Sequence, residues 1–162
     1  MAQVYLELGS SFVAYKNSFG PAYVKTNQQI GRVIVGFESS KTWSGELMTG
    51  IAQLSNNPVY LNNVAMSGLD IKFNKAYAVY LKGNQFISND LKFFGRVGFA
   101  NVAGSGTYQA VTEKFQESGI SYGLGAGVNF KGDQYLNIDY LSIINKNEMH
   151  IKAVSISYGK YF

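Results

Sequence analysis

Apolar residues alternate strictly with small or polar ones between residues 119 and 130. One face of an extended segment would carry Ile120, Tyr122, Leu124, Ala126, Val128 and Phe130, and the opposite face Gly119, Ser121, Gly123, Gly125, Gly127 and Asn129. A period of two predicts a β-strand. Because the bulky face is apolar and the other is small and polar, the pattern is typical of a transmembrane barrel strand, whose side chains point alternately to lipid and to a narrow hydrated lumen.

The same alternation recurs along the chain and predicts eight strands. They span residues 2–16, 28–39, 43–54, 70–85, 91–103, 119–131, 134–145 and 149–162. Eight strands with about 9 to 11 membrane-crossing residues each fit within 162 residues as one domain, residues 1–162. We therefore predict an all-β fold, an eight-stranded antiparallel transmembrane β-barrel with up-and-down connections.

The connections between these strands alternate in length. The long ones cover residues 17–27, 55–69 and 104–118, and the short ones residues 40–42, 86–90 and 132–133. The connection near residues 145–148 is short although it falls on the side of the long ones. Tight periplasmic turns and longer external loops are typical of outer-membrane barrels, and an even strand count returns both termini to one side. We expect both termini to be periplasmic.

Composition narrows the fold class further. The chain has 18 glycines, 15% aromatic residues, only 2 prolines and no cysteine, so disulfide and thiolate-metal frameworks are excluded. No apolar run approaches the roughly 18 residues of a spanning helix. The chain opens Met-Ala-Gln-Val without a basic and then apolar leader. We therefore expect that a signal peptide has been removed and that Ala2-Gln3 is the mature start.

Four segments carry a resemblance to a known family. They are residues 91–100, the glycine-alternating residues 122–127, the strand Asn137-Ile138-Asp139-Tyr140 and the terminal Tyr158-Gly159-Lys160-Tyr161-Phe162. With these segments the chain resembles, over essentially its full length, small outer-membrane β-barrels of the OmpA/OmpX type. The resemblance implies a monomeric protein of the Gram-negative envelope, without a cofactor. Its implied partners are outer-membrane lipids, lipopolysaccharide and, through the loops, extracellular ligands.

The end of the chain adds a second feature to this resemblance. A carboxy-terminal Phe that ends an alternating strand is similar to the signal by which the barrel-assembly machinery recognises its clients. The residues in register on the lipid face are Val154, Ile156, Tyr158 and Phe162. Lys160 occupies a position where an aromatic residue is usual, although a lysine there can extend its amine to the headgroups.

Parity assigns an uncharged set of side chains to the lipid. It includes Val4, Leu8, Phe12, Val35, Phe37, Trp43, Leu47, Tyr77, Val79, Phe93, Val97, Phe99, Ile138 and Tyr140. The outward positions of Lys75, His150 and Lys152 would be costly at the bilayer centre. We therefore expect these three residues at the outer interface.

The opposite face collects the charges. It carries Glu7, Arg32, Glu38, Glu46, Lys72, Lys82, Lys92, Arg96 and Asp139. Six of these fall at a similar middle depth and are predicted to pair across the lumen: Glu7, Arg32, Glu46, Lys82, Arg96 and Asp139. Pairing is far less costly than burying the charges singly. One interpretation is a structural network that plugs the narrow interior of eight strands. The alternative is a gate whose rearrangement opens a narrow, weakly conducting channel for small solutes.

Candidates for catalysis are few, so we predict that the protein is not an enzyme. His150 is the only histidine, with Glu148 and Lys152 on its face and Ser142 on the neighbouring strand. A second alternative is a lipid-A-modifying enzyme, because such enzymes occur on eight-stranded barrels. The His-x-Ser pattern of those enzymes is not found in this sequence.

Other binding functions find little support in the sequence. Neither Gly104-Ser105-Gly106 nor the glycine-rich residues 123–127 precede a helix, so they are not phosphate loops. The net charge of +4 is spread along the chain and does not indicate nucleic-acid binding. Loop lysines at positions 16, 25, 114 and 146 are either contacts for lipopolysaccharide phosphates or ordinary solvated side chains. A soluble lipocalin-like carrier is disfavoured because its lumen would be apolar, whereas the inward face here is predicted to be polar.

Overall fold

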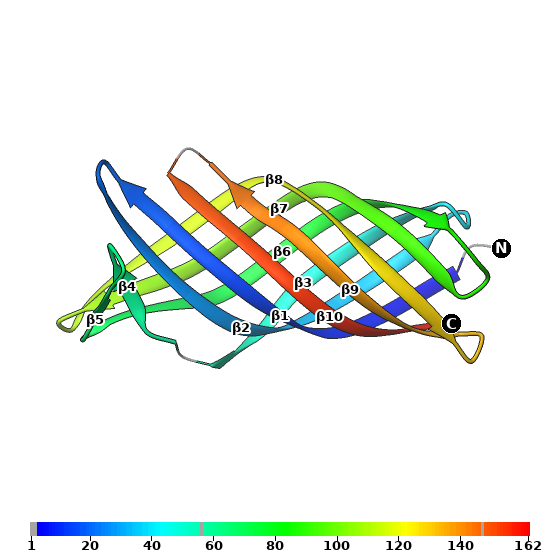
Figure 1. Ribbon diagram of the computed structural model, residues 1–162, viewed down its shortest axis with the longest axis horizontal. Coiled ribbons are helices and arrows are strands. Elements are labelled where there is room, and N and C mark those ends of the chain that lie inside the picture. Colours follow the sequence, from blue (N-terminus) through cyan, green and yellow to red (C-terminus); the bar gives the residue numbers. More distant parts are fainter. Residues whose placement is uncertain (1–2, 56, 147) are drawn as a thin grey trace.

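The computed structural model describes residues 3–55, 57–146 and 148–162, with the backbone alone for residues 51–55. Eight long strands form an antiparallel ring. They are β1 (Gln3–Phe19), β2 (Ala22–Glu38), β3 (Trp43–Ser55), β6 (Leu69–Phe86), β7 (Leu91–Tyr108), β8 (Val111–Phe130), β9 (Gln134–Asn145) and β10 (Met149–Tyr161). Each strand pairs with its neighbours in the chain, and β1 pairs with both β2 and β10, which closes the ring (Figure 1). The predicted eight-stranded antiparallel barrel is confirmed.

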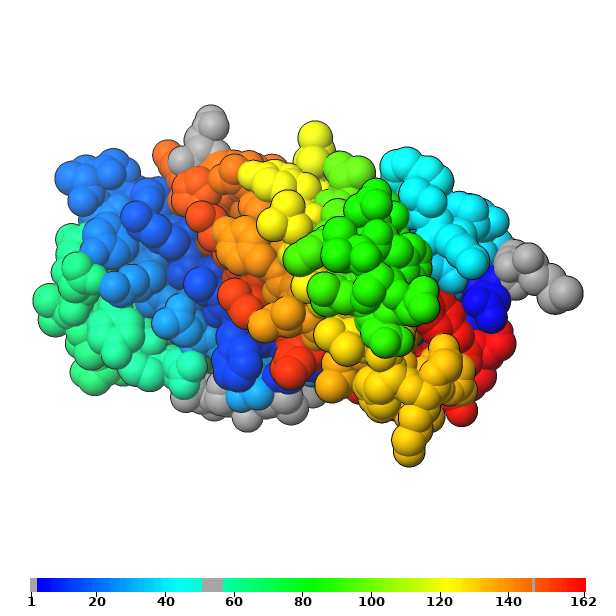
Figure 2. Space-filling view, turned by 45° about the vertical axis from the view of Figure 1, so that its right-hand side comes forward, coloured from blue at the N-terminus to red at the C-terminus, as the bar shows by residue number. Residues whose placement is uncertain are grey.

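The two ends of the barrel differ. Both termini lie at one end, here called the terminal end, together with the tight turns at residues 39–42, 87–90 and 131–133 (Figure 1). Figure 2 turns this end forward and shows the turn near residue 90 (green) beside the turn near residue 131 (golden) and the C-terminal residues (red). Backbone bonds join them, since the amide of Asn129 donates to Asp90 and that of Tyr161 to Asp133.

The opposite end, here called the distal end, carries strand where the sequence predicted long connections. Strands β1 and β2 continue through residues 17–27 to a turn at Gly20-Pro21, and β7 and β8 continue through residues 104–118 to a turn at Gln109-Ala110. Residues 55–69 contain a small hairpin of β4 (Val59–Leu61) and β5 (Val64–Met66), and β4 pairs with β2. These hydrophilic stretches are thus extended hairpins, whose outer faces are polar.

The exterior carries an apolar belt that ends well before the distal turns. Its last large apolar members toward the distal end are exposed: Phe12, Tyr77, Phe99, Ile120, Tyr140 and Val154. The next outward residues are small or polar, such as Ala14 after Phe12 and Asn101 after Phe99. Lys75 and Lys152 lie at this same level and are exposed, so they lie at an edge of the apolar belt, as their predicted interfacial place requires.

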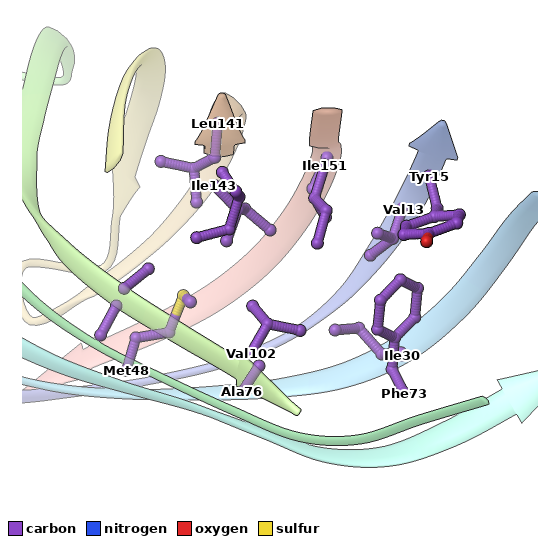
Figure 3. Packing of buried hydrophobic residues seen from close by; sticks show 14 of the residues in the cluster. Val13, Tyr15, Ile30, Met48, Phe73, Ala76, Val102, Leu141, Ile143 and Ile151 are labelled. Atoms are coloured by element: carbon purple, nitrogen blue, oxygen red, sulfur yellow. The ribbon is translucent and has the colours of Figure 1, made fainter. Parts of the chain in front are cut away.

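The polarity of the lumen also changes at about this level, but in the opposite direction: the lumen is charged inside the belt and apolar beyond it. Inside the belt, the lumen holds the charged side chains described in the next subsection. Toward the distal end it holds an apolar cluster, shown in Figure 3 pointing inward from both sides of the ring: Val13, Tyr15, Ile30, Phe73, Val102, Leu141, Ile143 and Ile151 are members. The prediction of a polar inward face was therefore wrong for the distal half. That half follows the rule of a water-soluble barrel, polar outside and apolar inside.

One inward assignment, that of Lys72, is wrong because β6 contains a β-bulge. The register against β7 shifts between Phe73 and Lys75, so one extra residue reverses the parity toward the start of the strand. Ile71 and Phe73 are consequently buried, whereas the Lys72 side chain is 50% exposed and pairs with Asp70 outside. The described residues include no helix long and apolar enough to cross a membrane.

Candidate functional site: a buried ion-pair network

The structure brings all six predicted network residues into one buried cluster. Three strands supply the acids Glu7 (β1), Glu46 (β3) and Asp139 (β9), and three others supply the bases Arg32 (β2), Lys82 (β6) and Arg96 (β7). None of these residues is more than 3% exposed. The members thus come from six of the eight strands and meet across the lumen.

Arg96 lies at the centre of the network. Its Nε donates to Oε2 of Glu46 at 2.5 Å, one terminal nitrogen donates to Oδ2 of Asp139 at 2.8 Å, and the other to Oε2 of Glu7 at 3.2 Å. The planar guanidinium, with its fan of donors, suits such a role. A single side chain thereby joins the three acids.

The two remaining bases complete the charge balance. Arg32 binds Asp139 through two parallel hydrogen bonds of 2.9 and 2.7 Å, and Lys82 Nζ lies 3.3 Å from Glu7 and 3.1 Å from Glu46. Three acids thus face three bases. Removing one partner of a buried pair leaves a charge without compensation, which typically costs about 3 to 5 kcal/mol.

Neutral side chains extend the network and were missed in the sequence analysis. Tyr5 donates its hydroxyl to Oε1 of Glu46 at 2.5 Å. The Tyr135 hydroxyl and the Asn137 amide both donate to Oε1 of Glu7, at 3.1 and 2.9 Å. The available signal was parity, because Tyr5 shares the inward face of β1 with Glu7, and the two β9 residues precede inward Asp139 by two and four positions.

Aromatic rings fill the space over glycines on adjoining strands. Phe94 lies opposite Gly125, and a Cβ built at Gly125 would come within 2.4 Å of its ring. Lys82 and Arg96 in turn lie over the same ring, at 4.5 and 4.6 Å from its centroid. The small face of residues 119–130 is therefore required for packing, since it makes room for inward side chains of β7.

Lys92 is a buried cation outside the six-residue network. It is 1% exposed, donates to the Tyr161 hydroxyl at 3.0 Å and lies 4.4 Å from the centroid of the Tyr135 ring. Glu38, also predicted to point inward, is half-buried near the terminal end. Both lie closer to the terminal end than the network does.

The proposed assembly residues occupy the outer face of β10 and the terminus. Val154, Ile156 and Tyr158 are exposed on the belt, and Phe162 is 70% exposed, with its amide donating to the carbonyl of Val4 at 2.9 Å. Their role in assembly remains a prediction.

The structure does not build a triad around His150. Its Nδ1 lies 2.6 Å from the side-chain oxygen of Asn145, whereas Ser142 pairs in the ladder with Lys152. The described residues also contain no cluster of His, Asp and Glu suited to a metal ion.

Sequence comparison identifies the family of this ring. Residues 2–162 match the family described as outer membrane protein beta-barrel domain. The chain belongs to this family. It is therefore an outer-membrane β-barrel, and the resemblance found in the sequence is confirmed. No curated protein matches the chain.

Solved structures support the same fold. The chain is similar to Ail, the attachment invasion locus protein of Yersinia pestis, with 14% identity, a TM-score of 0.70 and coverage of 99% of this chain and 98% of Ail. Neisserial surface protein A gives 12% identity, a TM-score of 0.70 and coverage of 100% of this chain and 99% of the neisserial protein. OprG of Pseudomonas aeruginosa gives 11% identity, a TM-score of 0.70 and coverage of 99% of this chain and 96% of OprG. At these identities the likeness concerns the fold.

Proposed function

We propose that this outer-membrane barrel is a non-enzymatic structural protein with a closed lumen, which supports the envelope and contacts molecules at the cell surface from its distal end. In this proposal both termini are periplasmic. The observation that carries it is the network centred on Arg96, because its ion pairs cross the lumen between six strands. A passing ion would have to separate these pairs.

The apolar cluster is a second barrier that supports a closed lumen. It fills the lumen on the distal side of the network with side chains such as Phe73 and Ile151, which are 8% and 1% exposed. A hydrated ion entering this region would lose water without gaining a polar partner, which is costly. Two consecutive barriers of different chemistry therefore oppose conduction.

Planar-bilayer recording tests the closed lumen. The wild-type protein should give no steady current, because both barriers are intact. Large, steady, porin-like openings would refute the proposal. Brief small openings that become more frequent in Arg96→Ala than in the exposed control Lys146→Ala would instead favour the gated channel.

The absence of catalysis has its own test. Mass spectrometry of lipid A and phospholipids should give the same species from cells expressing wild type, His150→Ala or an empty vector. A lipid that gains or loses an acyl chain with wild type but not with His150→Ala would establish the lipid-modifying alternative.

A second observation favours contact with anionic polymers. Beyond the belt, the outward face carries Lys16, Lys25, Lys72, Lys75, Lys114 and Lys152 around the ring. Two carboxylates, Asp70 and Glu148, also lie on this outward face, and Asp70 pairs with Lys72 at 3.1 Å. An outward surface on which lysines outnumber carboxylates attracts anions. A structure of Ail has been solved in complex with the heparin analogue sucrose octasulfate, which shows that a barrel of this fold can bind a polyanion.

Charge-matched variants test this surface. Lys72→Gln/Lys75→Gln/Lys152→Gln removes three distal charges, and Lys41→Gln/Lys131→Gln/Lys160→Gln removes three at the terminal end. Binding of lipopolysaccharide and of sucrose octasulfate should weaken in the first variant alone. If binding weakened equally in both variants, the net charge of the protein would explain the effect, and a specific distal binding surface would be contradicted.

A further inference from the structure

The distal end contains a cavity that the closed-lumen role does not use. Its volume is about 570 Å³, within the roughly 300 to 1,000 Å³ of small-molecule sites. It lies between the tips of β1, β2, β6, β7, β8 and β10, and its main lining side chains are Tyr15, Leu69, Ile71, Tyr108, Phe115 and Met149. The walls are therefore largely apolar and aromatic.

The floor of the cavity is a packed set of rings. Phe115 stacks on Tyr15 with ring centroids 6.0 Å apart, and Phe73 meets Tyr15 edge-on at 5.8 Å. The apolar cluster and then the ion-pair network lie below these rings. The cavity is thus a dead end that opens at the distal mouth, as a binding pocket does, and is not part of a passage.

The two glycines of Gly104-Ser105-Gly106 have different effects on this space. Phe115 occupies the room over Gly104, where an added Cβ would come within 2.3 Å of its ring. An added Cβ at Gly106 would meet no described atom within 4 Å. Gly106 lies two residues along from Gly104 on the same inward face and lines the cavity. Its missing side chain leaves the cavity open.

The polar groups at the mouth indicate the head group of a ligand. Asn17 and Gln109 supply amides, and Glu113 supplies a carboxylate on the inward face of β8, opposite Gly106. Lys114 starts from the outer face, as the strand neighbour of Glu113, but its long side chain also lines the rim of the cavity. One acid and one base thus lie at the mouth beside the two amides. Because these charges balance and the carboxylate is on the inward face, an uncharged head group is favoured over an anionic one.

We propose that this cavity binds a small uncharged amphiphile, an aliphatic chain with a hydroxyl-type head, taken up from the water outside the cell. The chain would lie against Phe115, Ile71 and Met149, and the head would bond to the amides at the mouth. The source is the water phase because the cavity lies in the section beyond the apolar belt, whose exterior is polar.

A brominated alcohol can report on occupancy through fluorescence quenching. Trp43, the only tryptophan of the chain, lies on the belt at the terminal end and is 51% exposed. The double variant Trp43→Phe/Tyr108→Trp, here called the reporter variant, moves the fluorophore to the mouth of the cavity. With the protein in nanodiscs, ω-bromoundecanol should quench the indole emission of the reporter variant saturably, whereas quenching of Trp43 in the wild type should rise linearly as the probe enters the lipid.

A filled cavity provides the decisive comparison. Gly106→Phe in the background of the reporter variant should weaken saturable binding by about tenfold or more, because its ring would occupy the space of the chain. Gly45→Phe is the matched control, since an added Cβ there also meets no described atom within 4 Å and Gly45 lies on the exterior of β3. Unchanged affinity in Gly106→Phe, or purely linear quenching in the reporter variant, would overturn the proposal.

Two further measurements keep the test independent of folding and fix the ligand class. If Gly106→Phe does not assemble, Leu69→Phe narrows the same cavity from β6 and should also weaken binding; unchanged affinity would contradict the site. The anion ω-bromoundecanoate should bind at least several-fold more weakly than the alcohol. Equal or tighter binding of the anion would overturn the assignment of an uncharged head group.

Discussion

The ring of Tyr5 lies directly across the backbone of Gly36, its partner on β2. A Cβ built at Gly36 would be only 2.0 Å from Cζ of the ring. The same ring position lets the hydroxyl reach Glu46 on β3 at 2.5 Å. The missing side chain of Gly36 thus leaves the space in which the Tyr5 ring lies, and so allows β1 to bond to the ion-pair network through the Tyr5 hydroxyl.

The variant Gly36→Ala should therefore destabilise the barrel. The added methyl displaces the Tyr5 ring and breaks its bond to Glu46, and overpacking of this kind typically costs about 1 to 3 kcal/mol. Urea unfolding in lipid vesicles, followed by tryptophan emission, measures the change. Gly45→Ala serves as the control and should not lose stability, because a Cβ there meets no described atom within 4 Å and alanine is favoured over glycine within a strand.

Removing the central guanidinium should have a larger effect. Arg96→Met leaves Glu7, Glu46 and Asp139 with two bases, so the free energy of unfolding should fall by about 3 to 5 kcal/mol. The exposed pair of Lys146 and Glu117, at 2.7 Å, is the comparison. Lys146→Met should cost less than about 1 kcal/mol. Similar losses in the two variants would show that burial adds nothing to the network.

The sequence allowed the fold and the charged members of the network to be predicted for one reason. Alternation with period two holds through the belt, so parity placed Glu7, Arg96 and Asp139 on one face correctly. Parity fails where an extra residue enters a strand, as at the bulge before Lys75, and this explains the error at Lys72. Nothing in the local sequence there distinguishes a bulge from a regular strand.

The extended distal hairpins escaped prediction for two physical reasons. Their outer faces are polar because they meet water, so they have the composition of loops. The turn of β7 and β8 also lacks the usual turn residues, since Gln109 and Ala110 adopt φ values of 47° and 68°. Such turns normally carry Asn-Gly or Asp-Gly.

That turn gives a stabilising substitution. Ala110→Gly should raise the free energy of unfolding by about 0.5 to 1 kcal/mol, because glycine adopts positive φ without steric cost. The same change in a regular strand, Ala126→Gly in β8, should lower it by about 0.5 to 1 kcal/mol. Urea titration of both variants provides the comparison. A loss of stability in Ala110→Gly would contradict the turn described here.

The boundary of the belt can be located with spin labels. Single cysteines are straightforward because the chain contains none. A label at Phe99→Cys should be more accessible to oxygen, which concentrates in lipid, and a label at Asn101→Cys more accessible to a water-soluble nickel chelate. Phe12→Cys and Ala14→Cys should repeat the change on β1. A lipid-like profile at residues 14 and 101 would move the boundary and refute a distal section outside the membrane.

The C-terminal residue provides the fifth prediction. Phe162→Ala should reduce the heat-shifted, assembled fraction in cells, yet should refold as wild type in detergent, because a recognition signal acts only where the assembly machinery is present. Phe86→Ala, another exposed phenylalanine near the terminal end, is the control. Equal assembly of Phe162→Ala and wild type in cells would contradict a role of Phe162 in recognition. An equal defect in detergent would show that Phe162 stabilises the folded barrel instead.

The change of polarity along the barrel axis also sets the register of the strands. Alternation alone forbids a slip of one residue, which would exchange inside and outside, but it permits a slip of two. If β6 slipped two residues toward the terminal end, Lys75 would enter the belt at the level now held by Tyr77, and Lys82 would leave Glu7 and Glu46. The sequence of each strand thus fixes two things: which side chains face the lumen, and the depth at which the strand passes from the apolar belt to the distal section. Together these two constraints allow a single register between neighbouring strands.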